Sequence, residues 1–408
     1  MTATRKWISC QIGAREHYAI PRALRMKNLC AGVVTDYWAG GKLESILPGS
    51  MSQSLATRFH SDLASENVVG LNSGFLKLEM ASRIKKRDGW PLILHRNNWF
   101  QEAASKKVAA IIERSKSEKP PAVFGFCYAA RQIFETAKEH GCPTVLGQID
   151  PGPFEVRLVQ ELHDRHGIEP LATPPENYWE NWRAECELAD CIIVNSSWSQ
   201  QALVNEGVPL EKIEIVPLAY QAPKDVVIQT KETPNQFSQN RPLQILYLGQ
   251  MIARKGVVEL IDAIDRLGDR PMHWTMVGGG DANLLDQLRQ RDRVTVTGQV
   301  DRESAILYYQ NADVFILPTH SDGFAITLLE AAAFGLPIVA SPFCGDVVRN
   351  GIDGLTMPEV SCDAIASSID SLIDSPETLA QFRANQLDRQ FRTITDLSED
   401  LFNINQRI

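Results

Sequence analysis

The second half of the chain alternates short apolar runs with longer helical stretches, and this pattern constrains the fold more than any other feature of the sequence. The runs predict strands at residues 243–248, 274–277, 294–297, 314–317 and 338–340. Such regular alternation, with short loops between the elements, predicts a parallel sheet with helices on both faces. The first half alternates in the same way but with longer insertions.

The domain organisation follows from the length and from one change in composition. At 408 residues the chain exceeds what one ordinary core supports, so we expect two domains. Residues 221–242 are polar and carry three prolines, which is typical of a linker. We therefore predict an α/β protein with two Rossmann-like domains, residues 1–220 and 243–390, facing each other across a cleft. Residues 391–408 are predicted to form a helix that packs back on the first domain.

Charge, cysteine content and hydropathy limit the partners and the cellular compartment that this protein can have. The formal net charge of −9 argues against nucleic acid as a partner. No apolar run approaches the ~20 residues that span a bilayer, and the first residues lack the apolar core of a signal peptide. None of the eight cysteines forms a C-x-x-C pair, so reduced thiols are expected rather than zinc ligands or disulfides. These features predict a cytoplasmic protein with at most peripheral membrane association.

One basic segment stands out against the acidic balance. The helix predicted over residues 71–87 ends in Arg83, Lys85, Lys86 and Arg87. A basic helix end beside a cleft could meet anionic lipid or a phosphate. The same residues would also complement the helix dipole as a solvated face. The sequence leaves both interpretations open.

The stretch that follows the strand at 314–317 reads as a loop, a helix over 324–334 and another strand. Asp322 and Gly323 therefore lie where a helix begins at the carboxyl end of a strand, the edge at which open α/β sheets bind ligands. The unbonded amides of such a helix start favour an anion. Glu330 lies two turns further along the helix. Taken alone, the two carboxylates fit an acidic helix cap and a solvated glutamate equally well.

Two further loops at strand ends in this half carry suggestive residues. Arg254 and Lys255 form a double cation that would grip a phosphate. The glycine run at 278–280 would let a ligand approach the backbone, although Asn283 stands where a G-x-G-x-x-G motif needs its last glycine. Glu330 could accept hydrogen bonds from a ribose diol. Cations, helix amides and a diol acceptor at successive strand ends together predict a nucleoside diphosphate site.

The first half offers candidates for the opposite side of the cleft. Gly13 directly follows the first strand, where a ligand can approach the backbone. A helix predicted from Gly13 to Leu24 would point Arg15 and His17 into the cleft, but a plain strand-to-helix turn with surface charges fits equally well. Asp150 stands between the end of another strand and a Pro-Gly pair, either as a site residue or as a turn-forming aspartate.

These residues also carry a family resemblance. Asp322 and Glu330, with seven residues between them, resemble the paired acidic residues in the signature of retaining family 4 glycosyltransferases. That family has the GT-B fold and belongs to the glycogen-synthase-like superfamily. The similarity extends to segments at 189–196, 247–256, 277–280, 312–318 and 335–340. It covers about the second half of the chain, whereas the first domain is similar only in layout.

The resemblance implies a retaining enzyme of the hexosyltransferase type, which moves a sugar from a nucleotide-sugar donor, expected to be a UDP-linked hexose, to a hydroxyl acceptor. Glu330 would bind the ribose. Asp322 and the amides of Phe324 and Ala325 would face the donor sugar. The other residues expected along the donor are Gly13, Gln250, Gly278, Gly279, Gly298 and Gly323.

The resemblance also implies how the leaving group is handled. Lys255, with Arg254, would neutralise the diphosphate, since fixed cations stabilise the charge that develops on the departing phosphate. GT-B enzymes need no metal for this, and no cofactor is implied beyond the nucleotide sugar, which is a substrate. The leaving phosphate would help to deprotonate the acceptor on the same face. The acceptor, a glycan, a lipid-linked molecule or a small molecule, would bind the first domain near Gly13.

The sequence departs from the family pattern at several positions. Gln250 stands where the family usually has Arg, and Arg254 lies four residues later. Asp322 replaces a Glu, and Ala325 replaces a Gly. The histidine that commonly follows the strand ending at residue 126 is absent. The acceptor side is therefore assigned to Arg15, His17, His95, Tyr128 and Asp150. Asp150 joins Lys255, Arg254 and Asp322 as the predicted catalytic residues.

Other functions fit the same fold. A nucleotide-sugar epimerase would bind the same donor but isomerise it. A non-catalytic nucleotide-sugar-binding protein would fit the substitutions at Gln250 and Asp322. A nicotinamide-dependent oxidoreductase is disfavoured, because the glycine run is not a dinucleotide motif.

Overall fold

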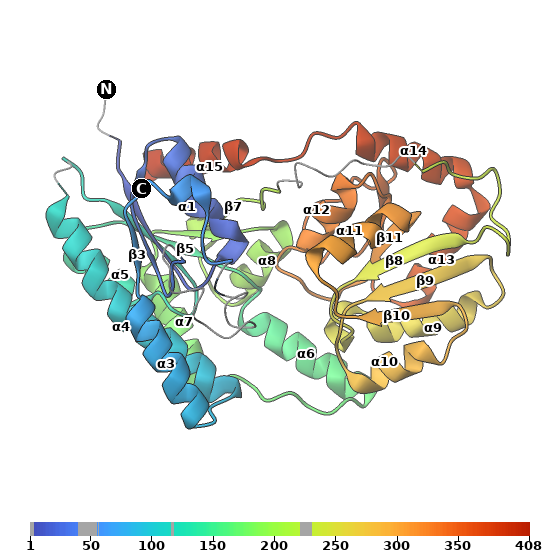
Figure 1. Ribbon diagram of the computed structural model, residues 1–408, viewed down its shortest axis with the longest axis horizontal. Helices are drawn as coiled ribbons and strands as arrows, with labels where there is room; N and C mark the ends of the chain where they lie inside the picture. The colour runs from blue at the N-terminus through green and yellow to red at the C-terminus, as the bar shows by residue number, and fades with distance from the viewer. Residues whose placement is uncertain (1–3, 40–54, 56, 116–117, 221–230) are drawn as a thin grey trace.

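The computed structural model describes residues 4–39, 55, 57–115, 118–220 and 231–408, which form two α/β domains side by side (Figure 1). Residues 221–230 of the predicted linker lie outside the described residues. Each domain is built on one sheet in which neighbouring strands run parallel. The parallel-sheet architecture predicted from the alternation is therefore confirmed.

The first domain holds a seven-stranded sheet. Its strands are β1 (Trp7–Gln11), β2 (Cys30–Thr35), β3 (Val68–Gly70), β4 (Ala122–Phe126), β5 (Thr144–Gly147), β6 (Cys191–Val194) and β7 (Ile213–Ile215). They lie in the order β3-β2-β1-β4-β5-β6-β7. Every residue of β1 and β4 is buried, because helices cover both faces, and this explains their apolar runs without alternation.

The helices of this domain pack on the sheet in two groups. They are α1 (Ala19–Met26), α3 (Asn72–Ile84), α4 (Gly89–Arg114), α5 (Arg131–Glu139), α6 (Pro153–His166), α7 (Glu176–Leu188) and α8 (Ser197–Asn205), with short 3-10 turns η1 (Arg15–Tyr18), η3 (Ser61–Leu63) and η4 (Leu210–Lys212). α4, α5 and α7 cover the face that presents Ile8, Val123 and Leu146. α1 covers the other face, where Trp7 and Phe124 lie.

The second domain holds a six-stranded sheet. Its strands are β8 (Leu243–Leu248), β9 (Met272–Val277), β10 (Val294–Gly298), β11 (Val314–Leu317), β12 (Ile338–Ala340) and β13 (Gly354–Thr356), in the order β10-β9-β8-β11-β12-β13. The connecting elements are η5 (Ala253–Lys255), α9 (Val257–Leu267), α10 (Ala282–Arg289), α11 (Arg302–Asn311), α12 (Ile326–Ala333), α13 (Cys362–Asp374) and α14 (Pro376–Leu387). The chain order reverses between β8 and β11, which creates the switch point at which such sheets bind ligands.

The last helix returns to the first domain. α15 (Ile394–Arg407) lies beside α1, and the Trp7 indole donates a hydrogen bond to the Asn405 side chain at 2.8 Å. Leu397 and Leu401 are buried in the same cluster as Trp7. Figure 1 shows the red end of the chain running from α14 in the second domain to α15, which lies beside the blue α1.

The first strand-to-helix connection differs from its prediction. The helix expected from Gly13 begins only at Ala19. Glu16, His17 and Tyr18 have left-handed backbones with φ of 51°, 51° and 60°. Residues other than glycine rarely adopt this backbone conformation, so the loop is strained. The fully buried ring of Tyr18 anchors the segment.

Three other boundaries differ for identifiable reasons. α12 begins two residues later than predicted, because the Ala325 amide donates to the Cys344 carbonyl at 2.9 Å instead of lying inside the helix. The sequence predicts a helix over residues 97–116, but α4 begins at Gly89, since Pro91 fits the first turn of a helix. β13 forms where no strand is predicted, because three residues leave too short a pattern to read.

Candidate functional site

The loops that follow β8 and β11 touch along their backbones. Gly256 has a φ of 70°, and a Cβ built there would lie 1.7 Å from the carbonyl oxygen of Pro318. The Arg254 carbonyl accepts hydrogen bonds from the His320 amide at 2.8 Å and from the Thr319 hydroxyl at 3.1 Å. Only glycine permits such an approach. Gly256 therefore holds the predicted cation loop against the predicted acidic loop.

An ion pair crosses this contact. The Lys255 ammonium pairs with the Asp322 carboxylate, and the two side chains are 11% and 22% exposed. The sequence places Lys255 on the diphosphate and Asp322 beside the sugar, and the structure brings the two side chains together. An anion that binds Lys255 has to compete with Asp322 for the ammonium.

Arg254 is held by a carboxylate from the other domain. Its guanidinium donates to the Ser321 carbonyl and lies 3.4 Å from a carboxylate oxygen of Glu155. The Ser321 hydroxyl donates to the same Glu155 oxygen at 2.8 Å. Burial raises the pKa of Glu155, while the Arg254 cation opposes that rise. Sequence reasoning missed Glu155, because nothing in an acidic first turn of α6 indicates which loop it meets.

The predicted ribose carboxylate has a fixed orientation. The Tyr309 hydroxyl, on α11, donates to Glu330 Oε2 at 2.8 Å. The Tyr309 ring stacks on Phe334 with centroids 5.3 Å apart and an interplanar angle of 6°. Burial and the nearby Glu330 charge raise the pKa of Tyr309, so its hydroxyl stays protonated and remains a donor.

The acidic loop uses part of its own backbone internally. The Asp322 amide donates to the Phe343 carbonyl at 2.8 Å, and the Ala325 amide donates to the Cys344 carbonyl at 2.9 Å. The prediction that the Ala325 amide faces the donor sugar is therefore wrong for this conformation. The segment after β12 takes up that amide, and no local pattern in the sequence indicates such a contact.

The glycine run joins neighbouring loops. A Cβ on Gly278 would lie 2.0 Å from the Gly249 carbonyl oxygen, and one on Gly280 would lie 2.2 Å from that of Met251. Gly278 also bridges Gly298. These glycines thus pack the loops after β8, β9 and β10 together, which is a structural reason for their presence.

Two other residues predicted to bind the sugar donor lie in these packed loops. Gly279 lies between the two tightly packed glycines, and its carbonyl accepts a hydrogen bond from the Met251 amide at 2.8 Å. Gln250 is anchored through its carbonyl, which accepts from the Tyr247 hydroxyl at 2.7 Å. Its side chain is exposed. The edge formed by these loops is therefore rigid in its backbone and polar on its surface.

Asp150 lies on the first-domain side of the site. Its Oδ1 accepts hydrogen bonds from the Tyr128 hydroxyl at 2.5 Å and from the Gly152 amide at 2.9 Å. Burial raises the pKa of Asp150, and these hydrogen bonds oppose that rise. A Cβ on Gly323 would lie 3.3 Å from the Asp150 Cα and 2.5 Å from the Ile149 carbonyl oxygen. Asp150 and the acidic loop of the second domain are therefore direct neighbours.

One face of α7 supports Asp150 through its neighbours. Tyr178 stacks on Tyr128, with centroids 4.6 Å apart. Trp182 donates to the Gln148 side chain at 3.0 Å, and Gln148 donates to the Asp150 carbonyl at 2.9 Å. Tyr178, Trp182 and Glu185 follow the i, i+4, i+7 spacing of one helical face. This face sets the position of the Tyr128–Asp150 pair.

Glu185 holds the backbone of Tyr128. Its carboxylate accepts from the Tyr128 amide at 2.6 Å and from the Ala130 amide at 2.8 Å. Tyr128 has a φ of 75°, a left-handed conformation that these contacts stabilise. Burial raises the pKa of Glu185 to about 7, against the effect of the amide donors. Sequence reasoning missed Glu185, although an acidic residue on the apolar face of a helix is a readable signal.

The other predicted acceptor-side residues divide into two places. Gly13 donates its amide to Asp36 at 2.8 Å. The Arg15 guanidinium lies 5.1 Å from the centre of the Phe126 ring, and its charge opposes the rise that burial causes in the pKa of Asp150, so it belongs to the same edge. His17 is exposed. His95 lies on α4 and lines a separate polar hollow with Trp99, Gln132 and Asn181, among others. The structure thus gathers Arg15, Tyr128 and Asp150 but not His95.

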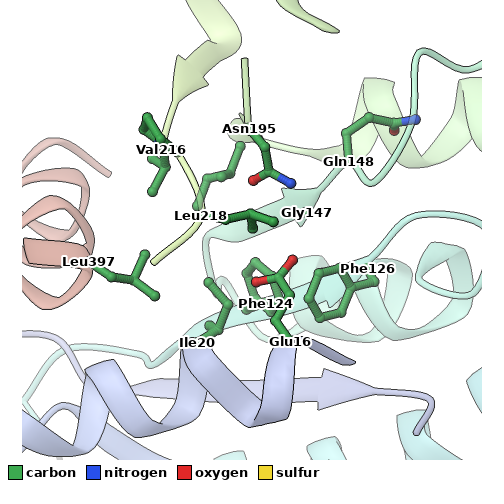
Figure 2. A pocket seen from close by; sticks show the side chains of 12 residues that line it. Glu16, Ile20, Phe124, Phe126, Gly147, Gln148, Asn195, Val216, Leu218 and Leu397 are labelled. Carbon is green, nitrogen blue, oxygen red and sulfur yellow. The ribbon is translucent and has the colours of Figure 1, made fainter. Parts of the chain in front are cut away.

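A small pocket lies beneath this edge. Figure 2 shows the Glu16 side chain pointing into it, among Ile20, Phe124 and Phe126, with Asn195 across the pocket. Its volume is about 20 Å³, room for a water molecule but not for a sugar. Burial raises the pKa of Glu16 to about 7, and Arg15 opposes the rise. The pocket therefore holds a half-buried acid and has no room for a substrate.

Neither a metal cluster nor a membrane-spanning helix is found among the described residues. No group of three or more His, Cys, Asp or Glu side chains there has the arrangement of a metal site. No helix within those ranges is both long enough and apolar enough to cross a membrane.

The fold of the whole chain and a family model that matches the second domain show which class of protein this chain is similar to. Two parallel-sheet α/β domains in this arrangement are the GT-B fold. Residues 229–389 match the family model described as glycosyl transferases group 1. This confirms the glycosyltransferase resemblance for the second domain, while the assignment to retaining family 4 stays a prediction.

Individual relatives agree with this match. Glycogen synthase of Mycobacterium tuberculosis is 32% identical over 152 residues, which are 35% of this chain and 36% of the relative. The chain thus spans about a third of the length of that curated relative. The sucrose-phosphate synthase structure from Thermosynechococcus elongatus has a TM-score of 0.63 at 17% identity, covering 99% of each chain. The Anabaena HepE structure in complex with UDP has a TM-score of 0.61 at 15% identity, covering 99% of this chain and all of that one.

Proposed function

We propose that this protein is a glycosyltransferase that moves a sugar from a nucleotide-sugar donor to a hydroxyl acceptor. The observation that carries the proposal is the backbone contact at Gly256, which fixes the Arg254–Lys255 pair against the loop of Asp322. The glycosyl transferases group 1 match over residues 229–389 supports it. The complexes of the similarly folded HepE with UDP and with UDP-glucose support a UDP-linked hexose as the donor.

The two cations account for leaving-group stabilisation. Lys255 and Arg254 are each paired with a carboxylate, Asp322 and Glu155. A diphosphate, with its higher charge, displaces these carboxylates and takes up both cations. As the bond between the sugar C1 and the phosphate oxygen breaks, the cations stabilise the charge on the departing phosphate. They supply the positive charge that the step needs, so we propose transfer without a metal ion.

The second acidic residue orients the nucleotide. Tyr309 fixes the Glu330 carboxylate, which can then accept hydrogen bonds from a ribose diol. Glu330 lies within α12, and Asp322 lies in the loop just before it, so the ribose and the sugar are bound by neighbouring parts of one short segment. This places the diphosphate between them, at the cations.

The first domain supplies the acceptor side. Asp150 lies against Gly323, and Tyr128 and Gly152 hold its carboxylate. An acceptor hydroxyl bound there attacks C1 from the face that the phosphate leaves, and its proton passes to the leaving diphosphate. The new bond joins C1 to the acceptor oxygen with the configuration retained. Asp150 orients the hydroxyl by accepting a hydrogen bond from it.

Donor screening followed by product analysis tests the proposal. Nucleotide sugars that bind raise the melting temperature of the protein. The expected result is that a UDP-linked hexose does so and that added hydroxyl acceptors yield a glycoside with the anomeric configuration of the donor, with or without a chelator. An isomerised donor without transfer would indicate an epimerase instead. Stable binding with neither transfer nor hydrolysis would indicate a non-catalytic binding protein.

A further inference from the structure

The most exposed large apolar side chains of the described residues gather at one end of the first domain. They are Ile84, Met80 and Leu171, which are 76%, 65% and 62% exposed. Met80 and Ile84 lie one turn apart on α3, so they share a helical face. Scattered single exposed residues are ordinary, but a cluster of the most exposed ones marks an interaction surface.

Contacts join the segment that carries Leu171 to the helices that carry the other two side chains. The Trp90 indole, at the start of α4, donates to the Ala172 carbonyl at 2.8 Å, which ties the loop of Leu171 to the turn between α3 and α4. Arg96 of α4 pairs with Glu79 of α3, so the two helices lie side by side as a hairpin. We call residues 77–93 together with Leu171 the α3–α4 tip. Figure 1 shows α3 and α4 ending at the lower edge of the first domain.

The α3–α4 tip is basic in an acidic protein. Five cationic residues lie on it: Lys77, Arg83, Lys85, Lys86 and Arg87. All but Arg87, which is half-buried, are exposed. Its acidic residues are Glu79, which Arg96 pairs, and Asp88. The whole chain carries a net charge of −9, so this positive surface is a local feature.

We propose that the α3–α4 tip docks on the surface of an anionic lipid bilayer. Cations near such a surface are attracted by its negative potential, and exposed apolar side chains beside them insert at the boundary of headgroups and acyl chains. A second copy of this chain is the poorer partner, because an isologous contact would bring two positive surfaces together. An anionic bilayer would attract the cations of the basic helix end and would also accommodate the apolar side chains beside them.

Vesicle flotation of the full chain tests this directly. The wild-type protein should float with vesicles that contain phosphatidylglycerol and stay behind with vesicles of phosphatidylcholine alone, and high salt should release it. Each lysine near the surface contributes about 1 kcal/mol, so removing one should lower partitioning about fivefold. The variants are Lys85→Glu with Lys86→Glu, and Met80→Ser with Ile84→Ser. Lys107→Glu on α4 and Leu307→Ser in the second domain are the matched controls, since both side chains are exposed.

Either pair of substitutions should reduce flotation strongly, while both controls float as the wild type does. Because all the altered side chains are exposed, thermal unfolding should stay unchanged in every variant. Equal flotation with both vesicle types, or unchanged flotation of both pair variants, would overturn the inference. So would a wild-type dimer in the absence of vesicles that Ile84→Ser converts to a monomer, since the surface would then join copies of the chain. Nucleotide binding is not part of the readout, so failure here leaves the proposed function standing.

Discussion

The Lys255 ammonium pairs with the Asp322 carboxylate at the contact between the loops that follow β8 and β11. Arg254, the adjacent cation, is paired with Glu155 from the opposite domain. Both proposed phosphate ligands are thus already neutralised by carboxylates. Nucleotide affinity then depends on how readily the diphosphate replaces them, and the carboxylates become sensitive probes of the site.

Removing the charge of Glu155 should tighten nucleotide binding. Glu155→Gln leaves Arg254 without its interdomain carboxylate, so the diphosphate meets less competition. We expect UDP affinity to rise severalfold, on the order of 1 kcal/mol, the size of one charge-assisted contact in a partly exposed site. Calorimetric titration measures it, with Glu161→Gln on the exposed side of α6 as the matched control. Weaker binding in Glu155→Gln would show that Glu155 supports the ligand instead of competing with it.

The ribose assignment of Glu330 has a specific test. Glu330→Ala should weaken UDP binding by about 1.5–3 kcal/mol, since a charged acceptor of hydrogen bonds is lost. Titration with 2′-deoxy-UDP should show a smaller difference between wild type and variant, because one of the two diol contacts is already missing. The UDP affinity of Tyr309→Phe should fall between those of the wild type and Glu330→Ala. An equal loss with both ligands would place Glu330 away from the ribose.

Glu185 should affect turnover without touching the donor. Glu185→Gln puts an amide NH₂ against a backbone amide donor, which loosens the left-handed Tyr128 and displaces Asp150. We expect kcat to fall roughly tenfold with the donor KM unchanged, and stability to fall by about 1–3 kcal/mol. Glu187→Gln, two residues along and exposed, is the control. A proportional change in donor KM would argue against a role confined to the acceptor side.

The half-buried Glu16 carboxyl of the small pocket makes stability depend on pH. The pKa of Glu16 rises from 4.5 to about 7 in the folded protein, so the folded state favours its protonated form. The associated stability is complete below pH 4.5 and is lost as the pH rises through about 7. Glu16→Gln should therefore gain stability relative to wild type between pH 5 and pH 8, by an amount on the order of 2 kcal/mol.

Urea unfolding at the two pH values gives the comparison. Glu185 shares the same direction of shift, so only the difference between Glu16→Gln and wild type isolates Glu16. Glu187→Gln should show no such difference. If the two unfolding curves of Glu16→Gln shift with pH as much as those of wild type, the Glu16 carboxyl is not buried in its neutral form.

The sheet architecture and the candidate second-domain loops were predictable for a common reason. Parallel strands all place their carboxyl ends at one edge, so residues after successive strands meet whatever their separation in sequence. Arg254, Lys255 and Asp322 meet in this way. Their positions directly after strand ends carry the information, and no side-chain detail is needed to bring them together.

Contacts that depend on backbone conformation or on distant partners were not predictable. The left-handed residues from Glu16 to Tyr18 read as a helix start, because their residue types do not signal positive φ. The Ala325 amide looks like a free helix amide until the segment at Cys344 accepts its hydrogen bond. Glu185 and Glu155 find their partners only once α7 and α6 are packed. Such partners are set by tertiary packing and not by local pattern.

The most direct test of the central claim is calorimetric titration of UDP into the wild type, Lys255→Ala and Lys255→Ala with Asp322→Asn. Arg266→Ala, another cation of the second domain paired with an aspartate, is the control. The account predicts that Lys255→Ala loses about 1.5–3 kcal/mol of binding free energy. It also predicts that Asp322→Asn restores part of this loss, because the unpaired carboxylate no longer repels the diphosphate. Wild-type affinity in Lys255→Ala would contradict the account.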